Sequence, residues 1–382
     1  MKIAIIDISG KVYQYDDALG ESLVHDIAHD DSLVLAHPYA CLHRNCKPLR
    51  LYSFVPERFR SSFRIWKRLL KLLEGIVNYL LVLKYIKAEK IDILHLQWLP
   101  FLEVCSWERY WLQLVRKQNP QIKIVLTMHN IYPHNSTESQ KKAYKQRVLR
   151  LLPLIDAWIV HTHDAVNRMQ EEYGIDARII HIIHHGLFVP KTIHSERKRM
   201  DDKVRFLMFG QQSAYKGTDI FIEAVEQLPT TIKEKIEVQI LGRTEQTLYA
   251  TYAARAEKEH ITWINRYISD DDLTQALQDS DVQVFPYRTI TQSGALLLGL
   301  YFQKPLIVSN LPAFTETLGA NYPKSLIVEA GDAKSLSEAI IRYVNHPIEL
   351  NAFKNYIQPI LDQNSWQNAT QKTYQLYHTL LG

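Results

Sequence analysis

Residues 281–310 constrain the fold of this chain most, because a strand, a loop, a helix and a second strand follow one another without interruption. Val282–Phe285 is a short apolar run of the kind found in buried parallel strands. A polar loop, a Ser293-Gly294 step and an apolar helix over residues 295–302 come next. Ligands of such sheets bind beyond the carboxyl ends of strands, where a helix N-terminus offers N–H groups to an anion. The segment is therefore either an anion-binding turn or a turn that binds nothing.

Strand and helix patterns alternate along the rest of the chain. Strands are expected at residues 2–8, 33–36, 91–96, 123–128, 157–161 and 178–183, then at 204–209, 238–241, 261–263, 282–285, 306–308 and 326–328. Helix-like stretches separate them, among them 219–228, 271–278 and 333–345. Residues 190–203 are charged and poor in apolar side chains, which indicates a linker. The chain of 382 residues is predicted to be α/β, with two doubly wound Rossmann-like domains that face a central cleft.

Positive charge is concentrated in one stretch. Residues 44–90 hold twelve Lys or Arg and three Glu, a net charge of +9 in a protein whose total is +4. Within the stretch, apolar side chains recur every three or four positions, at Phe59, Phe63, Trp66, Leu70, Leu73, Val77 and Leu80. This pattern predicts a long helix that is either an ordinary core-facing helix or a helix on an anionic membrane surface. Nucleic acid is not the expected partner, because no reader motif accompanies the charge.

Cysteine usage and hydropathy bear on the compartment. Cys41, Cys46 and Cys105 are odd in number and lack a paired spacing, which argues against a disulfide framework and a zinc site. The N-terminus resembles a first core strand rather than a signal peptide, and the most apolar stretch, 69–86, carries four polar residues. We expect a cytoplasmic protein that is either soluble or peripheral at the inner face of the cell membrane.

Cations and backbone amides converge on one edge of the second predicted sheet. Gly210 ends its first strand, and Lys216 precedes the next helix. Arg288 lies in the loop before the Ser293–Gly294 helix start. Two cations and a helix N-terminus can hold a diphosphate and stabilise a leaving phosphate without a metal ion. We therefore expect no metal and no cofactor.

Several ordered motifs resemble glycosyltransferase family 4, a family of retaining enzymes with the GT-B fold. In the second half they are FGQQSAYKGTDIFIEA, SDDDLTQALQDSDVQVFPY, TQSGALLLGLYFQKPLIVSN and EAGDAKSLSEAI, and in the first half IDILHLQW, VLTMHN, DAWIVHT and IIHHG. The resemblance covers nearly the whole chain. It implies an acceptor-side domain at 1–190, a linker at 191–203, a nucleotide-sugar domain at 204–362 and a terminal helix at 363–382 that crosses back to the first domain.

The chain departs from the family pattern at the donor site. The family usually carries Glu-x7-Glu, and here those positions are Ile290 and Leu298. The segment from Thr291 through Gln292, Ser293 and Gly294 to Ala295 is similar to a variant whose side chains and amides serve the sugar and phosphates. The family's phosphate-binding arginine is replaced by Gln211, which leaves Lys216 with Arg288 or Arg243 as substitutes.

Histidines and other polar groups at strand ends complete the candidate site. By resemblance, His129 lies beside the donor sugar; the alternative is a structural strand-end histidine. His185 resembles a cleft histidine but can equally be structural, and Glu316 and Asp7 are further cleft candidates. Possible acceptor contacts are His95, Gln97 and Trp98, whereas packing or surface roles are expected for His161, His163, His181 and His184.

The resemblance implies transfer of a sugar from a nucleotide diphosphate sugar to a saccharide hydroxyl, with retention of anomeric configuration. The expected catalytic residues are His129, Lys216 and Arg288. A lipid-linked saccharide acceptor in surface polysaccharide assembly suits the basic stretch. Two alternatives are a nucleotide-sugar epimerase of the same fold and a non-catalytic glycosyltransferase-like partner protein, which the missing glutamates favour.

Overall fold

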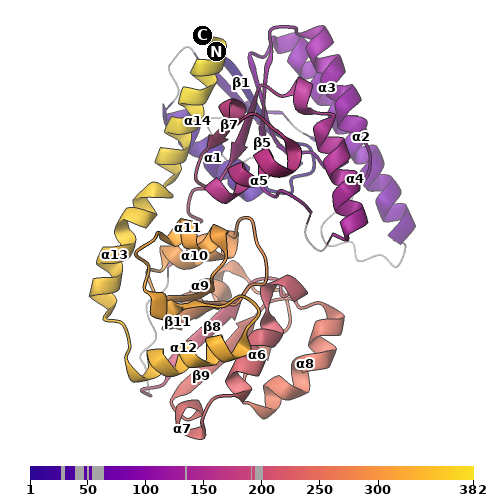
Figure 1. The fold of residues 1–382 in the computed structure, drawn as a ribbon. Helices are drawn as coiled ribbons and strands as arrows, with labels where there is room; N and C mark the ends of the chain where they lie inside the picture. The colour runs from indigo at the N-terminus through magenta and orange to yellow at the C-terminus, as the bar shows by residue number, and fades with distance from the viewer. Residues whose placement is uncertain are drawn as a thin grey trace. The chain divides into compact units, whose positions relative to one another are not determined.

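The computed structural model describes residues 1–26, 31–38, 47–49, 51–53, 64–133, 136–190, 192–193 and 201–382 (Figure 1). The chain forms two compact units. Unit 1 comprises Met1–Gly186 together with Ser365–Gly382, and unit 2 comprises Leu187–Asn364. Most of the expected linker, including residues 194–200, lies outside the described residues.

Unit 1 is built on a seven-stranded parallel sheet in the order β3-β2-β1-β4-β5-β6-β7. The order reverses between the neighbours β1 and β4, which is the switch point where doubly wound sheets bind ligands. The strands are β1 (Lys2–Asp7), β2 (Ser32–Ala36), β3 (Lys47–Pro48), β4 (Ile93–Trp98), β5 (Lys123–Thr127), β6 (Ala157–Val160) and β7 (Ile180–Ile182).

Helices connect these parallel strands. They are α1 (Tyr13–Asp26), α2 (Arg64–Glu89), α3 (Trp107–Gln118), α4 (Glu138–Leu149) and α5 (His163–Tyr173). The last helix of the chain, α14 (Trp366–Leu381), also belongs to this unit. Helix α14 packs against α1 (Figure 1). Asp31 ties both ends of the chain into this unit, since its carboxylate accepts bonds from the Met1 ammonium and the Tyr374 hydroxyl.

Unit 2 is built on a six-stranded parallel sheet in the order β10-β9-β8-β11-β12-β13. Its order reverses between β8 and β11. The strands are β8 (Val204–Phe209), β9 (Ile236–Leu241), β10 (Thr262–Ile264), β11 (Val282–Phe285), β12 (Leu306–Ser309) and β13 (Ile327–Val328). The inner strands β8, β11 and β12 are almost wholly apolar because helices cover both faces of the sheet.

The helices of unit 2 are α6 (Thr218–Glu226), α7 (Thr230–Lys233), α8 (Gln246–Lys258), α9 (Asp270–Asp279), α10 (Gly294–Tyr301), α11 (Pro312–Leu318), α12 (Ala333–Asn345) and α13 (Leu350–Gln363). Local sequence explains several of their starts. The Ser269 hydroxyl accepts a hydrogen bond from the Asp272 amide, and three aspartates in the first turn of α9 interact favourably with the positive end of the helix dipole. The predicted α/β architecture with parallel doubly wound sheets is confirmed.

Helix α2 turns a different face inward from the one expected. The side chains of Leu70, Leu73 and Leu80 are 42%, 54% and 57% exposed. The buried face instead carries Tyr79, Val82 and Ile86, with Glu74, Gly75 and Asn78 among them. The interpretation in which these leucines face the core is therefore wrong. Phe59 and Phe63 lie outside the described residues, as does the side chain of Trp66.

Candidate active site

In unit 2, the loops after the neighbouring strands β8 and β11 converge at the switch point. Gly210, directly after β8, has a φ of 93°, which a side chain would strain. A Cβ on Gly210 would lie 2.9 Å from Lys216 Nζ. Gly217 is equally constrained, since a Cβ there would lie 2.0 Å from the Pro286 carbonyl oxygen. Glycine at both positions lets the two loops close around the lysine.

The Lys216 side chain is buried rather than solvated. It is 7% exposed, at the end of the 3₁₀ turn η3 (Ala214–Lys216). Its Nζ lies 5.4 Å from the centroid of the Tyr287 ring. Burial lowers the pKa of the Lys216 ammonium. A buried ammonium with an aromatic neighbour is poised to bind an anion, because the anion would offset the desolvation of the charge.

Arg288 is committed to an ion pair within unit 2. Its Nη1 and Nη2 donate to the two carboxylate oxygens of Asp219 at 2.8 and 2.7 Å, and Nη1 also donates to the Ala214 carbonyl at 2.8 Å. The Arg288 backbone amide donates to the Tyr215 carbonyl at 2.7 Å. Arg288 therefore ties the loop after β11 to the turn that carries Lys216, and Asp219 offsets its charge.

The predicted anion-binding helix start is formed by α10. Ser293 caps it, because the Leu296 amide donates to Ser293 Oγ at 3.2 Å. Gly294 and Ala295 follow in the first turn, where the backbone amides have no carbonyl acceptor within the helix. Thr291 and Gln292 are half-buried in the loop ahead of the cap. The positive end of the helix dipole thus lies in the segment that follows Arg288.

The remaining donor-site candidates are less buried. Gln211 and Arg243 are exposed. A hydrogen bond of 2.8 Å from the Gln212 amide to the Arg243 carbonyl oxygen joins the two loops that carry them. Glu316 is half-buried in α11. Gly210, Lys216, Arg288 and the start of α10 are therefore the candidates that the fold groups around one switch point.

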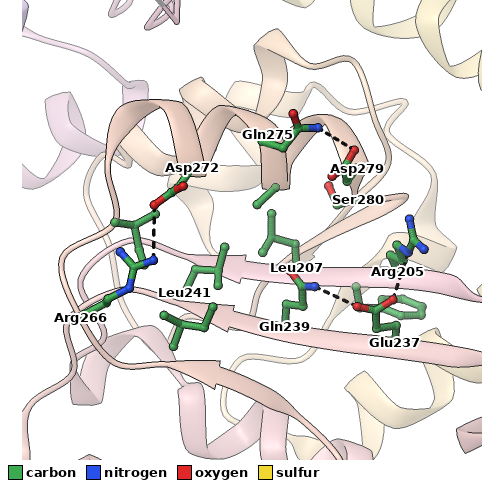
Figure 2. Close-up of a pocket in the computed structure, with 14 residues that line it drawn as sticks. Arg205, Leu207, Glu237, Gln239, Leu241, Arg266, Asp272, Gln275, Asp279 and Ser280 are labelled. Atoms are coloured by element: carbon green, nitrogen blue, oxygen red, sulfur yellow. Dashed lines mark hydrogen bonds and ion pairs between the residues drawn. The ribbon is translucent and has the colours of Figure 1, made fainter. Parts of the chain in front are cut away.

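A groove elsewhere in unit 2 runs between α9 and the strands β8, β9 and β10 (Figure 2). Four of its charged side chains form two ion pairs. Arg205 Nε lies 3.1 Å from Glu237 Oε2, and Arg266 Nη2 lies 3.4 Å from Asp272 Oδ2. The predicted donor-site residues are absent from its lining.

In unit 1, His129 follows β5 and lines a small pocket with Gln97, Trp98 and Thr127. Its ring is 8% exposed. His129 Nε2 lies 3.2 Å from Gln97 Oε1, and His129 Nδ1 lies 3.2 Å from His161 Nε2. Burial, followed by the neighbouring histidines, lowers the pKa of His129 well below its usual value. His129 is therefore neutral at physiological pH.

The other histidines of unit 1 that the sequence singled out are absent from the lining of this pocket. The Tyr15 ring packs against the rings of His129 and His185, with centroids 4.8 and 4.7 Å apart. His185 precedes Gly186, where a Cβ would lie 2.2 Å from the Trp366 ring of α14. His95 is fully buried in β4. Exposed His163 and half-buried His181 and His184 lie outside the pocket lining.

Asp7 organises the loop after β1. Its Oδ1 accepts bonds from the Ser9 amide and hydroxyl and from the Gly10 amide, and its Oδ2 accepts one from the Val12 amide at 2.9 Å. Burial raises the pKa of Asp7, although these hydrogen bonds act in the opposite direction. Asp16, buried in α1, has its pKa raised well above the usual value by burial and by Asp7.

Two family models together match most of the chain. The model described as Glycosyltransferase Family 4 matches residues 27–187, and the model described as Glycosyl transferases group 1 matches residues 190–358. The chain belongs to glycosyltransferase family 4. The predicted identity as a glycosyltransferase is confirmed by these matches.

Similar proteins include a GDP-mannose:glycolipid 4-beta-D-mannosyltransferase of Xanthomonas campestris pv. campestris. It is 22% identical over 312 residues, which are 77% of this chain and 81% of the relative. Among solved structures, sucrose-phosphate synthase of Thermosynechococcus elongatus has a TM-score of 0.72 at 16% identity. The match includes 100% of this chain and 99% of the synthase chain. Anabaena HepE with UDP and glucose has a TM-score of 0.71 at 13% identity and covers 99% of this chain and 100% of its own. This glycosyltransferase has the GT-B fold.

Sequence reasoning missed three residues that shape the candidate site. Asp219 offsets the charge of Arg288, and Tyr287 covers Lys216. His161, expected only to pack or lie on the surface, is a direct partner of His129. Asp219 and Tyr287 lie within the motifs quoted above and could have been nominated, whereas nothing in the sequence pairs His161 with His129.

Proposed function

We propose that this glycosyltransferase moves a sugar from a nucleoside diphosphate sugar to a hydroxyl of a glycolipid acceptor. The observation that carries the proposal is the buried Lys216 ammonium beside the switch point of the unit 2 sheet, where α10 also begins. The solved HepE complex with UDP and glucose and the GDP-mannose name of the Xanthomonas relative support a nucleotide-sugar donor. The glycolipid in that relative's name supports a lipid-linked acceptor.

Unit 2 binds the donor in this proposal. Lys216 and the first-turn amides of α10 hold the diphosphate, and Thr291, Gln292 and Ser293 contact the sugar and phosphates. Arg288 acts by holding the lysine turn, because Asp219 already offsets its charge. As the bond to the sugar breaks, charge develops on the leaving phosphate, and fixed cations and helix amides stabilise it.

Unit 1 binds the acceptor, and His129 contacts the transferred sugar. We propose retention of configuration, with the acceptor proton passing to the leaving phosphate. Two polar groups near the strand ends are poor bases: the Asp7 oxygens already accept four bonds, and burial weakens His129 as a base.

The test combines a panel of nucleotide sugars with a glycolipid acceptor. Acceptor-dependent release of nucleoside diphosphate, with a new glycolipid, is the expected result. An epimerised donor formed without acceptor would support an epimerase instead, and no reaction with any donor would favour a non-catalytic partner protein. The product linkage, read by NMR, decides the stereochemistry: an α-linked donor that gives a β-linked product, the linkage named for the Xanthomonas relative, would contradict retention.

We further propose that α2 docks this enzyme on an anionic membrane at the inner face of the cell membrane. Leu69, Leu73 and Leu80 recur along one face of α2 and are 45%, 54% and 57% exposed. Exposed Lys84 and Lys87 continue that face toward the end of the helix. An apolar stripe flanked by lysines suits an interfacial helix, which inserts its apolar face and attracts anionic headgroups. Among the helices that the structure describes, none is long and apolar enough to cross a bilayer.

A further inference from the structure

Four histidines of unit 1 come together although they are spread over 91 positions of the sequence, from His95 to His185. They belong to β4 or follow β5, β6 and β7, which are neighbours in the sheet. All four are 8% exposed or less. Buried imidazoles must satisfy both ring nitrogens, so the partners of each ring determine where its proton lies.

The hydrogen-bond partners of His161 leave one arrangement for a neutral ring. His161 Nδ1 lies 2.8 Å from the Ile183 carbonyl oxygen, which only accepts, so Nδ1 carries the proton. His161 Nε2 is then a bare acceptor. Burial lowers the pKa of His161 to about 4, so the ring is neutral at neutral pH.

His129 must complement this acceptor. His129 Nδ1 lies 3.2 Å from His161 Nε2 and therefore donates its proton to it. A neutral His129 then has a bare Nε2. Gln97 Oε1 lies 3.2 Å from that nitrogen, so two hydrogen-bond acceptors would face each other without a proton between them. The Gln97 amide resolves the conflict by turning over, which exchanges its oxygen and nitrogen with almost no change in shape.

The turned amide also completes the rest of the network. Gln97 Nε2 then donates to His129 Nε2, and Gln97 Oε1 faces His95 Nε2, which lies 2.7 Å from Thr127 Oγ1. His95 Nδ1 accepts from the Tyr377 hydroxyl, 2.5 Å away. Every group in the line is then neutral and every donor points toward Ile183. The opposite direction requires both nitrogens of His161 to donate, which places a positive charge in a buried site.

We propose that His161 is a positioning residue that keeps His129 in the tautomer with a proton on Nδ1 and a bare Nε2. His129 then accepts a bond at Nε2 from the Gln97 amide, and from a sugar hydroxyl that replaces it when substrate binds. This role rests on the proposed function of His129 beside the sugar. It excludes His129 as a donor to that hydroxyl.

The experiment measures the tautomer directly in the full-length protein with ¹⁵N-labelled histidine rings. Two-bond ¹H–¹⁵N correlation spectra at neutral pH distinguish the two neutral tautomers, and the signals that disappear in His129→Gln identify His129 among the sixteen histidines. The expected wild-type state has the proton on Nδ1. A proton on Nε2 in the wild-type protein overturns the proposal, even if variants of His161 do not fold.

Variants then test whether His161 causes the preference. His161→Leu removes the acceptor and should shift His129 toward the Nε2-protonated tautomer, whereas His161→Gln restores an amide oxygen near the same place and should preserve the wild-type tautomer. His163→Leu, at an exposed position at the start of α5, is the matched control. Persistence of the wild-type tautomer in folded His161→Leu also overturns the proposal.

Kinetics separate this inference from the proposed function. His161→Leu should lower kcat/KM for the donor by about tenfold, the effect of one lost neutral hydrogen bond, with recovery in His161→Gln. If the tautomer shifts as expected but the wild-type protein transfers no sugar, the proposed function fails and the tautomer assignment stands. If transfer is present and insensitive to the shift, the positioning role fails.

Discussion

Arg288 and Asp219 form a two-point ion pair, with nitrogen–oxygen distances of 2.8 and 2.7 Å, between the loop after β11 and the first turn of α6, which follows Lys216. If the pair acts by holding the lysine turn, Arg288→Gln and Asp219→Asn should each weaken donor binding by a similar factor of about five, as expected for a partly exposed pair. The double variant should be no worse than either single variant, because both remove one interaction.

Titration calorimetry with the nucleoside diphosphate measures this coupling. Arg255→Gln, which breaks a comparable pair with Glu226 between α8 and α6, is the matched control and should leave binding unchanged. Tighter binding in Asp219→Asn, together with a loss of more than about 100-fold in Arg288→Gln, would instead show Arg288 on the diphosphate.

Replacing Lys216 tests the diphosphate site. Lys216→Ala should reduce turnover at saturating donor by on the order of 100-fold or more, because a preorganised cation near the leaving phosphate is lost. Its melting temperature should not fall, since burial of an ammonium opposes folding. Lys235→Ala, an exposed lysine of unit 2, serves as control. Wild-type turnover in Lys216→Ala would remove the lysine from the site.

Transfer should survive metal chelation. In the proposed mechanism, Lys216 and the α10 N-terminus stabilise the charge that a divalent ion would otherwise stabilise, so excess chelator should leave the initial rate unchanged. The rate is measured as nucleotide release before and after chelation. Loss of activity that added Mg²⁺ or Mn²⁺ restores would refute the metal-free account.

The exposed face of α2 should carry vesicle binding. Replacing Leu69, Leu73 and Leu80 with Ser should abolish sedimentation with phosphatidylglycerol vesicles and leave turnover on a short soluble acceptor near normal. A matched control replaces Val189, Ile193 and Leu350, exposed apolar residues of unit 2. Indifference of the wild-type protein to these vesicles at low salt would end the membrane proposal.

Salt should separate the two contributions of α2 to vesicle binding. Lys84→Gln with Lys87→Gln should weaken binding most at low salt, because the screening length falls from roughly 10 Å at 0.1 M to roughly 3 Å at 1 M. Equal effects of these substitutions at both salt concentrations would contradict an electrostatic role.

Glu108 should make stability depend on pH. Its carboxyl accepts bonds from the Tyr79 hydroxyl and the Phe101 amide, and burial raises its pKa from 4.5 to about 7. The folded state then holds a proton that the unfolded state releases, so stability should fall as pH rises from about 4.5 to about 7. Glu108→Gln mimics the protonated acid and should raise the free energy of unfolding at pH 8 by on the order of 3 kcal/mol.

Denaturant unfolding of both proteins at pH 4.5 and pH 8 measures this effect. Glu103→Gln, an exposed neighbour, is the control and should change nothing at either pH. Equal destabilisation by Glu108→Gln at both values would show that the carboxylate is ionised in the folded protein.

Local sequence was sufficient for most of the elements. Apolar runs predicted β8 and β11 with the observed bounds, and the pattern over 333–345 predicted α12 with its observed bounds. These signals work because each element buries its own contiguous or periodic set of side chains. The two-residue strand β3, Lys47–Pro48, has no such run and was missed. Gly210 was also expected at the end of β8, where the structure places it with a positive φ.

Tertiary structure decided which surfaces these elements bury and which polar groups meet. Helix α2 has apolar residues on both sides, so periodicity alone did not reveal that Tyr79 faces the core and Leu73 faces outward. Lys216 is buried because two loops far apart in sequence close around it. His129 and His161 pair because β5 and β6 are neighbours in the sheet. Burial, charge compensation and tautomer depend on contacts across the fold, and residue spacing along the chain does not encode those contacts.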